Sequence, residues 1–330
     1  MTLQALCEQL RHAHGLVLKR DIQAAAHILG CESMLAADGA TVRNGDDAAA
    51  LVDPDGYTLL AAEGMLPSFV QSDPWFAGYC AVMVNVNDIA AMGGQARAVV
   101  NVLFTGDDTT QLQVLSGLRD AALAFGVPVV GGHTSRFGGG RTLLAAAIVG
   151  KAKRLITSFD AAPGDVLVMV IDLHGRYRGE STYYDAATHA PAARLRGQLA
   201  LLPLLAQEGL VRAGKDISMA GIAGTLVMLC EGSGVGADLE LDALPRPPDA
   251  ALDRWLNSFP SFGFLLAVEP AKLPAVLSRC REQALSAAQV GCIQPGSQVM
   301  LSQAGDSALF WDLARDSLTG FGVQPTASGA

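Results

Sequence analysis

The sequence lacks any apolar run long enough to cross a membrane, although 50% of its 330 residues are hydrophobic. A membrane-spanning helix needs about 20 consecutive apolar residues. The longest runs here, at 143–150 and 165–173, have the length of strands buried on both faces. The N-terminal residues also lack the basic start, apolar core and cleavage site of a signal peptide. We therefore expect a cytoplasmic protein with no membrane partner.

Basic residues are too few and too scattered to form a nucleic-acid-binding surface. The chain has 23 Lys and Arg residues against 32 Asp and Glu residues, which gives a formal net charge of −9. Binding to a phosphate backbone depends on clustered Lys and Arg, so we expect no nucleic-acid partner. An acidic protein can still bind an anionic nucleotide when metal cations bridge the two.

Several common site signatures are absent as well. The six cysteines form no CxxC pair, which argues against a structural zinc site or a disulfide framework. No GxxxxGK[ST] phosphate-binding loop occurs. The glycine-rich run at 232–236 follows an expected helix rather than a strand, which disfavours a dinucleotide-dependent oxidoreductase.

Helical and strand patterns alternate along the chain, which predicts an α/β or α+β fold. The basic segment 151–165, which contains Pro and Gly, resembles a linker and suggests two domains, 1–155 and 156–330. Expected helices cover 2–30, 74–93, 109–126, 191–209, 220–232 and 271–286; the third has Asp108 or Thr109 as its expected cap and Gly126 as its stop. Expected strands lie within 42–62, where the turn DPDG joins two of them, and within 99–106, 127–135, 141–150, 166–172, 263–269, 297–303 and 307–312.

Acidic residues occur near the expected strand ends and helix starts. They are Asp46, Asp47, Glu63, Asp88 and Asp216. Each has an ordinary structural explanation: a solvated turn for the first two, a solvated strand end for Glu63, and helix caps for Asp88 and for Asp216 or Ser218. Asp88 stands out because it is the one charge in VNVNDIAAMGG, where an apolar run meets a run of small residues. A buried carboxylate is costly unless it is paired or bound to metal.

Oxygen-bearing side chains and glycines accompany these acids. Asn85 and Asn87 offer oxygens beside Asp88. In VVGGHTS, an expected short strand ends in a glycine turn at Gly131 and Gly132, whose backbone suits the approach of a phosphate, and His133 and Thr134 follow. His133 could bind a ligand or a phosphate, but a plain hydrogen-bonded histidine is the simpler explanation. Taken together, the acids and glycines fit a protein that holds Mg²⁺ against a nucleotide polyphosphate, because Mg²⁺ prefers carboxylate and water oxygens.

The order of these motifs resembles the aminoimidazole ribonucleotide (AIR) synthetase superfamily. The superfamily also contains thiamine-monophosphate kinase, selenophosphate synthetase and a carbamoyl-dehydrating hydrogenase maturation factor. The resemblance runs over nearly the whole chain through GDDAA, Glu63, VNDIAAMGG, GGHT, APGDVLVMV, KDIS, FPSFGFLLAVEP and AAQVGCIQPGSQVML. It implies an N-terminal α/β domain whose sheet pairs with its twin in a homodimer, and a C-terminal α+β domain.

The resemblance also implies ATP and Mg²⁺ as cofactors and a small-molecule substrate. The implied metal ligands are Asp46, Asp47, Glu63, Asp88 and Asp216. The implied catalytic residues are His133 and Asp216, and the implied nucleotide contacts are Asn85, Asn87, Gly131, Gly132 and Thr134.

The sequence departs from the substrate signature of each relative. Glu63 stands where relatives usually have Asp, and Met219 replaces the second acid of the kinase motif DISDG. Cys31 has no lysine close behind it, as selenophosphate synthetase requires, and the final residues ASGA lack the cysteine of the carbamoyl-dehydrating relative. An ATP- and Mg²⁺-dependent enzyme acting on a small metabolite is therefore expected, with Arg176 and Arg178 as candidate contacts to an anionic substrate. A non-catalytic nucleotide-binding protein and a divergent thiamine-monophosphate kinase remain alternatives.

Overall fold

The computed structural model describes residues 1–30, 33–136 and 141–322, which divide between two compact units. Unit 1 consists of Met1–Asp46, Ile156–Ala186 and Gly209–Ala330, and unit 2 of Asp47–Leu155 and Ala187–Glu208. The boundary that the sequence suggests after residue 155 is one of the points at which the chain passes between the units. No helix among the described residues is long and apolar enough to span a membrane.

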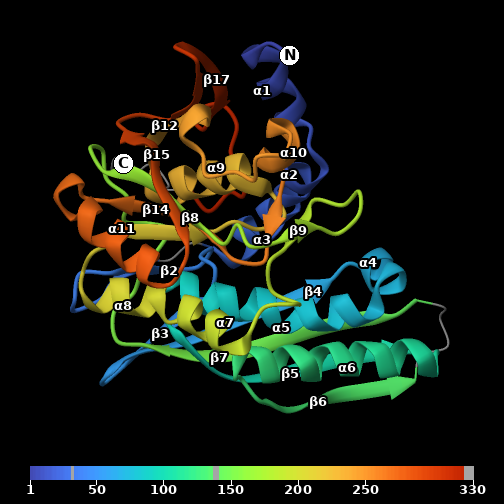
Figure 1. The fold of residues 1–330 in the computed structure, drawn as a ribbon. Coiled ribbons are helices and arrows are strands. Elements are labelled where there is room, and N and C mark those ends of the chain that lie inside the picture. Colours follow the sequence, from blue (N-terminus) through green and yellow to red (C-terminus); the bar gives the residue numbers. More distant parts are fainter. Residues whose placement is uncertain (31–32, 137–140, 323–330) are drawn as a thin grey trace. The chain divides into compact units, whose positions relative to one another are not determined.

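Unit 2 is built on a five-stranded sheet with the order β3-β4-β7-β5-β6 (Figure 1). All pairings are antiparallel except that of β6, which runs parallel to β5. Its strands are β3 Ala49–Asp53, β4 Gly56–Met65, β5 Gln95–Thr105, β6 Val129–Arg136 and β7 Leu143–Ala152. Its helices are α4 Pro67–Ser72, α5 Pro74–Ala91, α6 Asp108–Phe125, α7 Ala192–Leu199 and α8 Leu201–Gln207.

Helices α5 and α6 cover one face of this sheet. Asp107 caps α6, because its carboxylate accepts a hydrogen bond from the N–H of Thr110 at 2.7 Å, and Gly126 ends the helix in the left-handed conformation. The glycine stop agrees with the sequence prediction, whereas the cap lies one residue before Asp108, the earlier of the two expected caps. Strand side chains alternate between faces, and exposed apolar residues lie on the face opposite the helices: Leu60, Val100, Val102 and Leu143.

The predicted helix over 74–93 is confirmed, but the explanation of Asp88 as a helix cap is wrong. Asp73 caps α5, and the helix runs without a break to Ala91, so Asp88 lies in its last turn and caps nothing. Every residue of α5 from Phe76 to Ala91 is buried. A helix that is apolar on all sides loses the 3.6-residue pattern, which is why its sequence resembles a buried strand.

Unit 1 contains a seven-stranded sheet with the order β11-β14-β8-β15-β12-β16-β17. These strands are β8 Val166–Ile171, β11 Ala213–Asp216, β12 Gly236–Glu240, β14 Gly263–Val268, β15 Ser286–Gln294, β16 Gln298–Gln303 and β17 Asp306–Asp312. Two small sheets comprise β1 Ser33–Leu35 with β2 Thr41–Arg43, and β9 Arg176–Tyr177 with β10 Tyr183–Asp185 and β13 Phe259–Pro260. The helices are α1 Leu3–Arg11, α2 His14–Leu18, α3 Ile22–Leu29, α9 Gly221–Ser233, α10 Leu252–Leu256 and α11 Leu273–Glu282.

Helix α9 packs on the seven-stranded sheet, and Leu167, Met169 and Ile171 of β8 share its hydrophobic core. Gly234 ends α9 in the left-handed conformation. The glycine-rich run at 232–236 therefore spans the end of α9 and the start of β12, and it does not follow a strand. The five described cysteines form no disulfide, and Cys31 lies outside the described residues.

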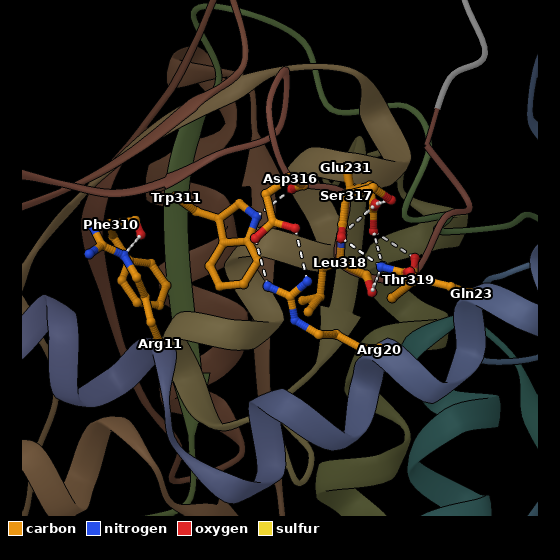
Figure 2. Close-up of polar contacts among 10 residues, drawn as sticks. All are labelled: Arg11, Arg20, Gln23, Glu231, Phe310, Trp311, Asp316, Ser317, Leu318 and Thr319. Carbon is orange, nitrogen blue, oxygen red and sulfur yellow. Dashed lines mark hydrogen bonds and ion pairs between the residues drawn. The ribbon is translucent and has the colours of Figure 1, made fainter.

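Polar contacts fasten the N-terminal helices to the C-terminal segment of unit 1 (Figure 2). Arg11 donates hydrogen bonds to the carbonyls of Phe310 and Leu309, at 2.7 and 2.6 Å. Arg20 forms a two-bond ion pair with Asp316, at 2.9 and 2.6 Å. Beside them, Glu231 accepts hydrogen bonds from backbone and hydroxyl groups of residues 317–320. These contacts explain why the N-terminal segment belongs to unit 1.

Candidate functional site

Strand register places four residues of unit 2 in one row across the sheet. Glu63 of β4 lies opposite Ala146 of β7, Ala146 lies opposite Asn101 of β5, and Asn101 lies opposite Gly132 of β6. Neighbouring strands are about 4.8 Å apart, so the row spans roughly 14 Å. Ala146 and Asn101 are buried. The row therefore faces the helices, and both of its ends, Glu63 and Gly132, are exposed.

Helix α5 is bound to the middle of this row. The side-chain amide of Asn85 donates hydrogen bonds to the carbonyls of Ala81 and Ala146, at 2.8 and 3.3 Å. Its Oδ1 is buried and accepts no hydrogen bond from any described residue, and Nδ2 of Asn101 likewise has no acceptor among them. Buried polar atoms without partners are rare in folded proteins and call for an explanation such as a ligand or an ordered water. Asn101 was not predicted; its signal is a single polar residue in the apolar strand VVNVLF.

Close packing explains one glycine of the GGHT motif. A Cβ atom at Gly132 would lie 2.4 Å from the carbonyl oxygen of Asn101, whereas one at Gly131 would have its nearest contact at 4.0 Å. The expected end of the strand at these glycines is wrong, because β6 continues to Arg136. The continued strand pairs with β5 over its whole length. This pairing holds it extended beyond the point where glycines suggested a turn.

Strand geometry consequently divides the GGHT motif between two faces. Gly132 and Thr134 lie on the face covered by the helices, while His133 points to the opposite face. There the His133 ring lies 5.3 Å from the ring of Phe104. The structure therefore does not bring His133 to the row of Glu63 and Asn101.

The polar residues of α5 point in different directions. An α-helix turns by about 100° per residue. Asn87 thus lies on the side of α5 opposite Asn85, whereas Asp88 lies about 60° from Asn85, one turn further along. Asn87 and Asp88 are 4% and 6% exposed, so both are largely removed from solvent. Asp88, the one carboxylate of α5, therefore lies nearer in direction to the sheet row than Asn87 does.

Asp46 and Asp47 lie in a turn between β2 and β3, as one interpretation of the sequence predicted. Asp46 is only partly exposed, and its carboxylate accepts hydrogen bonds from the N–H and hydroxyl of Ser158, at 2.9 and 2.8 Å. Both residues of this contact belong to unit 1, whereas unit 2 begins at Asp47. The two adjacent carboxylates thus belong to different units.

In unit 1, Asp216 is the last residue of β11 and is 6% exposed. Helix α9 begins at Gly221, after an N-cap at Ala220, so the expectation that Asp216 or Ser218 caps this helix is wrong. Arg176 is exposed on β9, and Arg178 forms an ion pair with Asp185 at 3.3 Å. Arg178 is thereby at least partly committed within the protein.

A histidine that was not predicted lies after β8. The Nδ1 atom of His174 lies 2.8 Å from the carboxylate of Asp172, whose side chain is 1% exposed. The signal in the sequence is the polar run DLH directly after the apolar strand VLVMVI.

Among the described residues, no three His, Cys, Asp or Glu side chains gather closely enough to hold a metal ion as a group. This arrangement still fits Mg²⁺ that arrives with a nucleotide, because Mg²⁺ commonly takes one or two protein carboxylates and completes its shell with phosphates and water. The carboxylates present could each supply one ligand to such an ion. They are not gathered into a preformed metal site.

Comparison with known proteins identifies relatives over nearly the whole chain. A protein of Synechocystis sp. called "Uncharacterized protein sll0787" is 46% identical over 97% of this chain and 98% of its own length. A thiamine-monophosphate kinase of Synechococcus elongatus is 30% identical over 75% of this chain and 84% of its own length.

Solved structures share the fold. T. maritima PurL complexed with ATP matches with a TM-score of 0.67 and 19% identity, over 80% of this chain and 45% of that one, so this chain spans less than half of it. AaThiL complexed with AMPPCP and TMP matches with a TM-score of 0.61 and 18% identity, over 81% and 91% of the two chains.

The family assignments agree with the two-domain fold. Residues 45–152 match the N-terminal domain of the AIR synthase related proteins, and residues 162–302 match the C-terminal domain. Both matches confirm the resemblance on which the fold expectation depended. The chain belongs to the AIR synthase related protein family.

Proposed function

We propose that the protein binds ATP with Mg²⁺ and transfers the γ-phosphoryl group to a small metabolite. The observation that carries this proposal is the row from Glu63 to Gly132 beneath α5. The row has a carboxylate, Glu63, at one end and a buried amide, Asn101, two strands away, and a second buried amide, Asn85, reaches the row from α5. Both amides have an unused hydrogen-bonding atom. Two solved structures with the same fold were complexed with ATP or AMPPCP. In phosphoryl transfer, Mg²⁺ neutralises phosphate charge, and the protein contributes mainly by positioning the reactants.

In this proposal the carboxylates of Asp47, Glu63 and Asp88 are the metal ligands of unit 2. Thr134 offers a hydrogen bond to the nucleotide, whereas Asn87, on the side of α5 away from the row, is not part of the proposed site. Asn85 and Gly132 act indirectly, because the first ties α5 to β7 and the second permits the close approach of β6 to Asn101. In unit 1, Asp216 is a buried carboxylate at the end of β11, and its role as a metal ligand or catalytic residue stays a prediction.

The proposal is tested by measuring ADP release from ATP and Mg²⁺. Thiamine monophosphate is the first acceptor, because one relative is named thiamine-monophosphate kinase. A panel of other phosphorylated, hydroxyl-bearing and amide-bearing metabolites follows. We expect acceptor-dependent ADP release that EDTA abolishes. Asp88→Asn should weaken Mg²⁺-dependent ATP binding about 10- to 100-fold.

Asp108→Asn is the matched control, because Asp108 is an exposed carboxylate of the same unit, 70% exposed at the start of α6. It should leave both ATP binding and ADP release unchanged. ATP binding without ADP release from any acceptor would favour the alternative of a non-catalytic nucleotide-binding protein. Absence of Mg²⁺-dependent ATP binding would contradict both.

We also propose that two copies pair through the open face of the unit 2 sheet. Val100, Val102, Leu60 and Leu143 are 41–46% exposed on this face, which is unusual for apolar side chains on adjacent strands. Val102→Glu should convert a dimer to a monomer in light scattering, because it places a charge within an apolar contact. Leu112→Glu, at a residue 67% exposed on α6, should leave the dimer intact. A wild-type monomer would contradict this proposal.

A further inference from the structure

A cavity of about 500 Å³ lies within unit 2, where the second half of α6 meets α7, β5 and the start of β6. Cavities that bind small molecules usually have about 300–1,000 Å³ and are lined mainly by apolar side chains with a few polar groups. The described residues that line this one all belong to unit 2, so one unit alone forms it. Its larger apolar lining residues are Leu115, Leu118, Leu123, Pro128 and Val129.

The apolar lining passes from buried to exposed surface. Leu118 is 2% exposed, whereas Leu123 is 66% exposed and Val129 is 36% exposed. Pro128 is exposed as well. The cavity is therefore open to solvent on one side. A molecule with an apolar body that covered these side chains would remove their surface from water, which favours binding.

Both charged residues in the described lining are arginines, although the protein has a formal net charge of −9. Arg196 of α7 lies across the C-terminus of α6, where its Nε and Nη2 donate hydrogen bonds to the carbonyls of Ala124 and Leu123, at 3.1 and 2.6 Å. Gly126 leaves room for it, because a Cβ atom there would lie 2.9 Å from Nε. The Nη1 group forms no hydrogen bond within the described part of the chain. Arg196 is thus held in place with one donor group unused.

Arg119 of α6 brings a second positive charge to the cavity. Its Nε and Nη2 both donate to one oxygen of Asp120, at 2.9 and 2.8 Å, and its Nη1 has no acceptor among the described residues. The Arg119 side chain is 66% exposed. Exposed ion pairs contribute little to stability, so this guanidinium can turn to a bound anion at small cost.

Asn101 adds a polar group on the side of β5. It is 7% exposed, and its Nδ2 has no acceptor among the described residues. Buried donors without an acceptor are rare in folded proteins. The two arginines beside it are donors too, and no carboxylate occurs in the described lining. The cavity therefore suits a ligand that supplies acceptor oxygens and negative charge.

We propose that this cavity binds a small organic anion, whose apolar body lies against the leucines and whose anionic group lies by the two arginines. Guanidinium groups form charge-assisted hydrogen bonds with carboxylates, which are stronger than those between neutral groups. A cation of the same size would instead be repelled. This site is additional to the proposed nucleotide site, and its ligand binds without ATP or Mg²⁺.

The charge of the ligand is tested with 8-anilinonaphthalene-1-sulfonate, an organic anion whose fluorescence rises when it leaves water. Octanoate and octylammonium, which have chains of equal length and opposite charge, are the competitors. We expect octanoate to displace the probe at a concentration at least about 10-fold lower than octylammonium does. Displacement by both at the same concentration, or no binding of the probe to the wild-type protein, would refute the inference.

The position of the site is tested by filling the cavity. Ala122 lines it and is partly exposed, so Ala122→Leu places three more carbon atoms in the cavity. We expect this variant to bind octanoate about 10-fold or more weakly. Ala124→Leu is the matched control, because Ala124 is a partly exposed alanine of the same helix outside the cavity lining. It should change the Kd for octanoate less than about twofold, and equal Kd values for the two variants would refute the inference.

Arg119→Glu tests the anionic group with an exposed residue that folding does not require. Reversing this charge should weaken octanoate binding about 10-fold or more. Arg141→Glu, at an exposed arginine of unit 2 outside the cavity lining, should change the Kd less than about twofold. Octanoate binding that Arg119→Glu leaves unchanged would refute the inference. ADP release enters none of these measurements, so their failure leaves the proposed function standing.

Discussion

Replacing Gly132 or its neighbour Gly131 by alanine should change the free energy of unfolding in opposite directions. At Gly132, the added Cβ would lie 2.4 Å from the carbonyl oxygen and 2.6 Å from Oδ1 of Asn101, so β6 must move away from β5. Overpacking of this kind costs about 1–3 kcal/mol. Gly132 also has φ of +157°, which L-residues rarely adopt and which adds about 1–3 kcal/mol. We expect Gly132→Ala to lower the free energy of unfolding of unit 2 by about 2–6 kcal/mol.

Gly131→Ala is the internal control, because its nearest contact is Val100 Cγ1 at 4.0 Å. A strand glycine replaced by alanine without a clash gains about 0.5–1 kcal/mol. Urea unfolding followed by a probe in unit 2, such as Trp75 fluorescence, measures both variants. Equal stability of the two variants would show that β6 does not approach Asn101 as the structure has it.

Two further predictions concern unit 1. Glu231→Ala removes the acceptor of hydrogen bonds from residues 317–320 and should lower the free energy of unfolding by about 3–5 kcal/mol in urea. Glu282→Ala, at an exposed residue of α11, should lower it by less than about 0.5 kcal/mol. Equal effects would contradict the role of Glu231 in holding residues 317–320. Burial raises the pKa of the Cys280 thiol to about 12, so its thiolate fraction at pH 8 is about 1 in 10,000. Maleimide mapped by mass spectrometry at pH 8 should therefore label the partly exposed Cys292 and spare Cys280 until the protein unfolds; equal labelling of the folded protein would refute this.

Local patterns predicted much of the fold. The DPDG turn between β3 and β4, the glycine stop of α6 and the apolar strand β8 depend on neighbouring residues, and each appears where the sequence indicates it. Asp88 was misread because α5 is buried on every side, which removes the contrast between its faces. A helix cap at Asp88 was inferred from the residues next to it, whereas the helix begins 14 residues earlier, at Pro74.

The arrangement of the site could not be predicted, because it depends on strand register. Nothing near Glu63 in the sequence indicates that Ala146, and through it Asn101, lies in the same row. The GGHT motif was read as a loop, since glycines usually end strands, but its pairing with β5 keeps it extended and turns His133 away from Gly132. Asp172 and His174 could have been predicted from the sequence, because polar residues directly after a buried strand lie where that strand ends at the surface of the sheet.

The most direct test of the central claim is a crystal structure of the protein with AMPPCP and Mg²⁺. The account predicts that the ion contacts the triphosphate and the carboxylates of Asp88 or Glu63, and that the nucleotide lies against unit 2 with Thr134 within hydrogen-bonding distance. A nucleotide bound elsewhere, or a metal ion that contacts none of the carboxylates Asp47, Glu63 and Asp88, would contradict it.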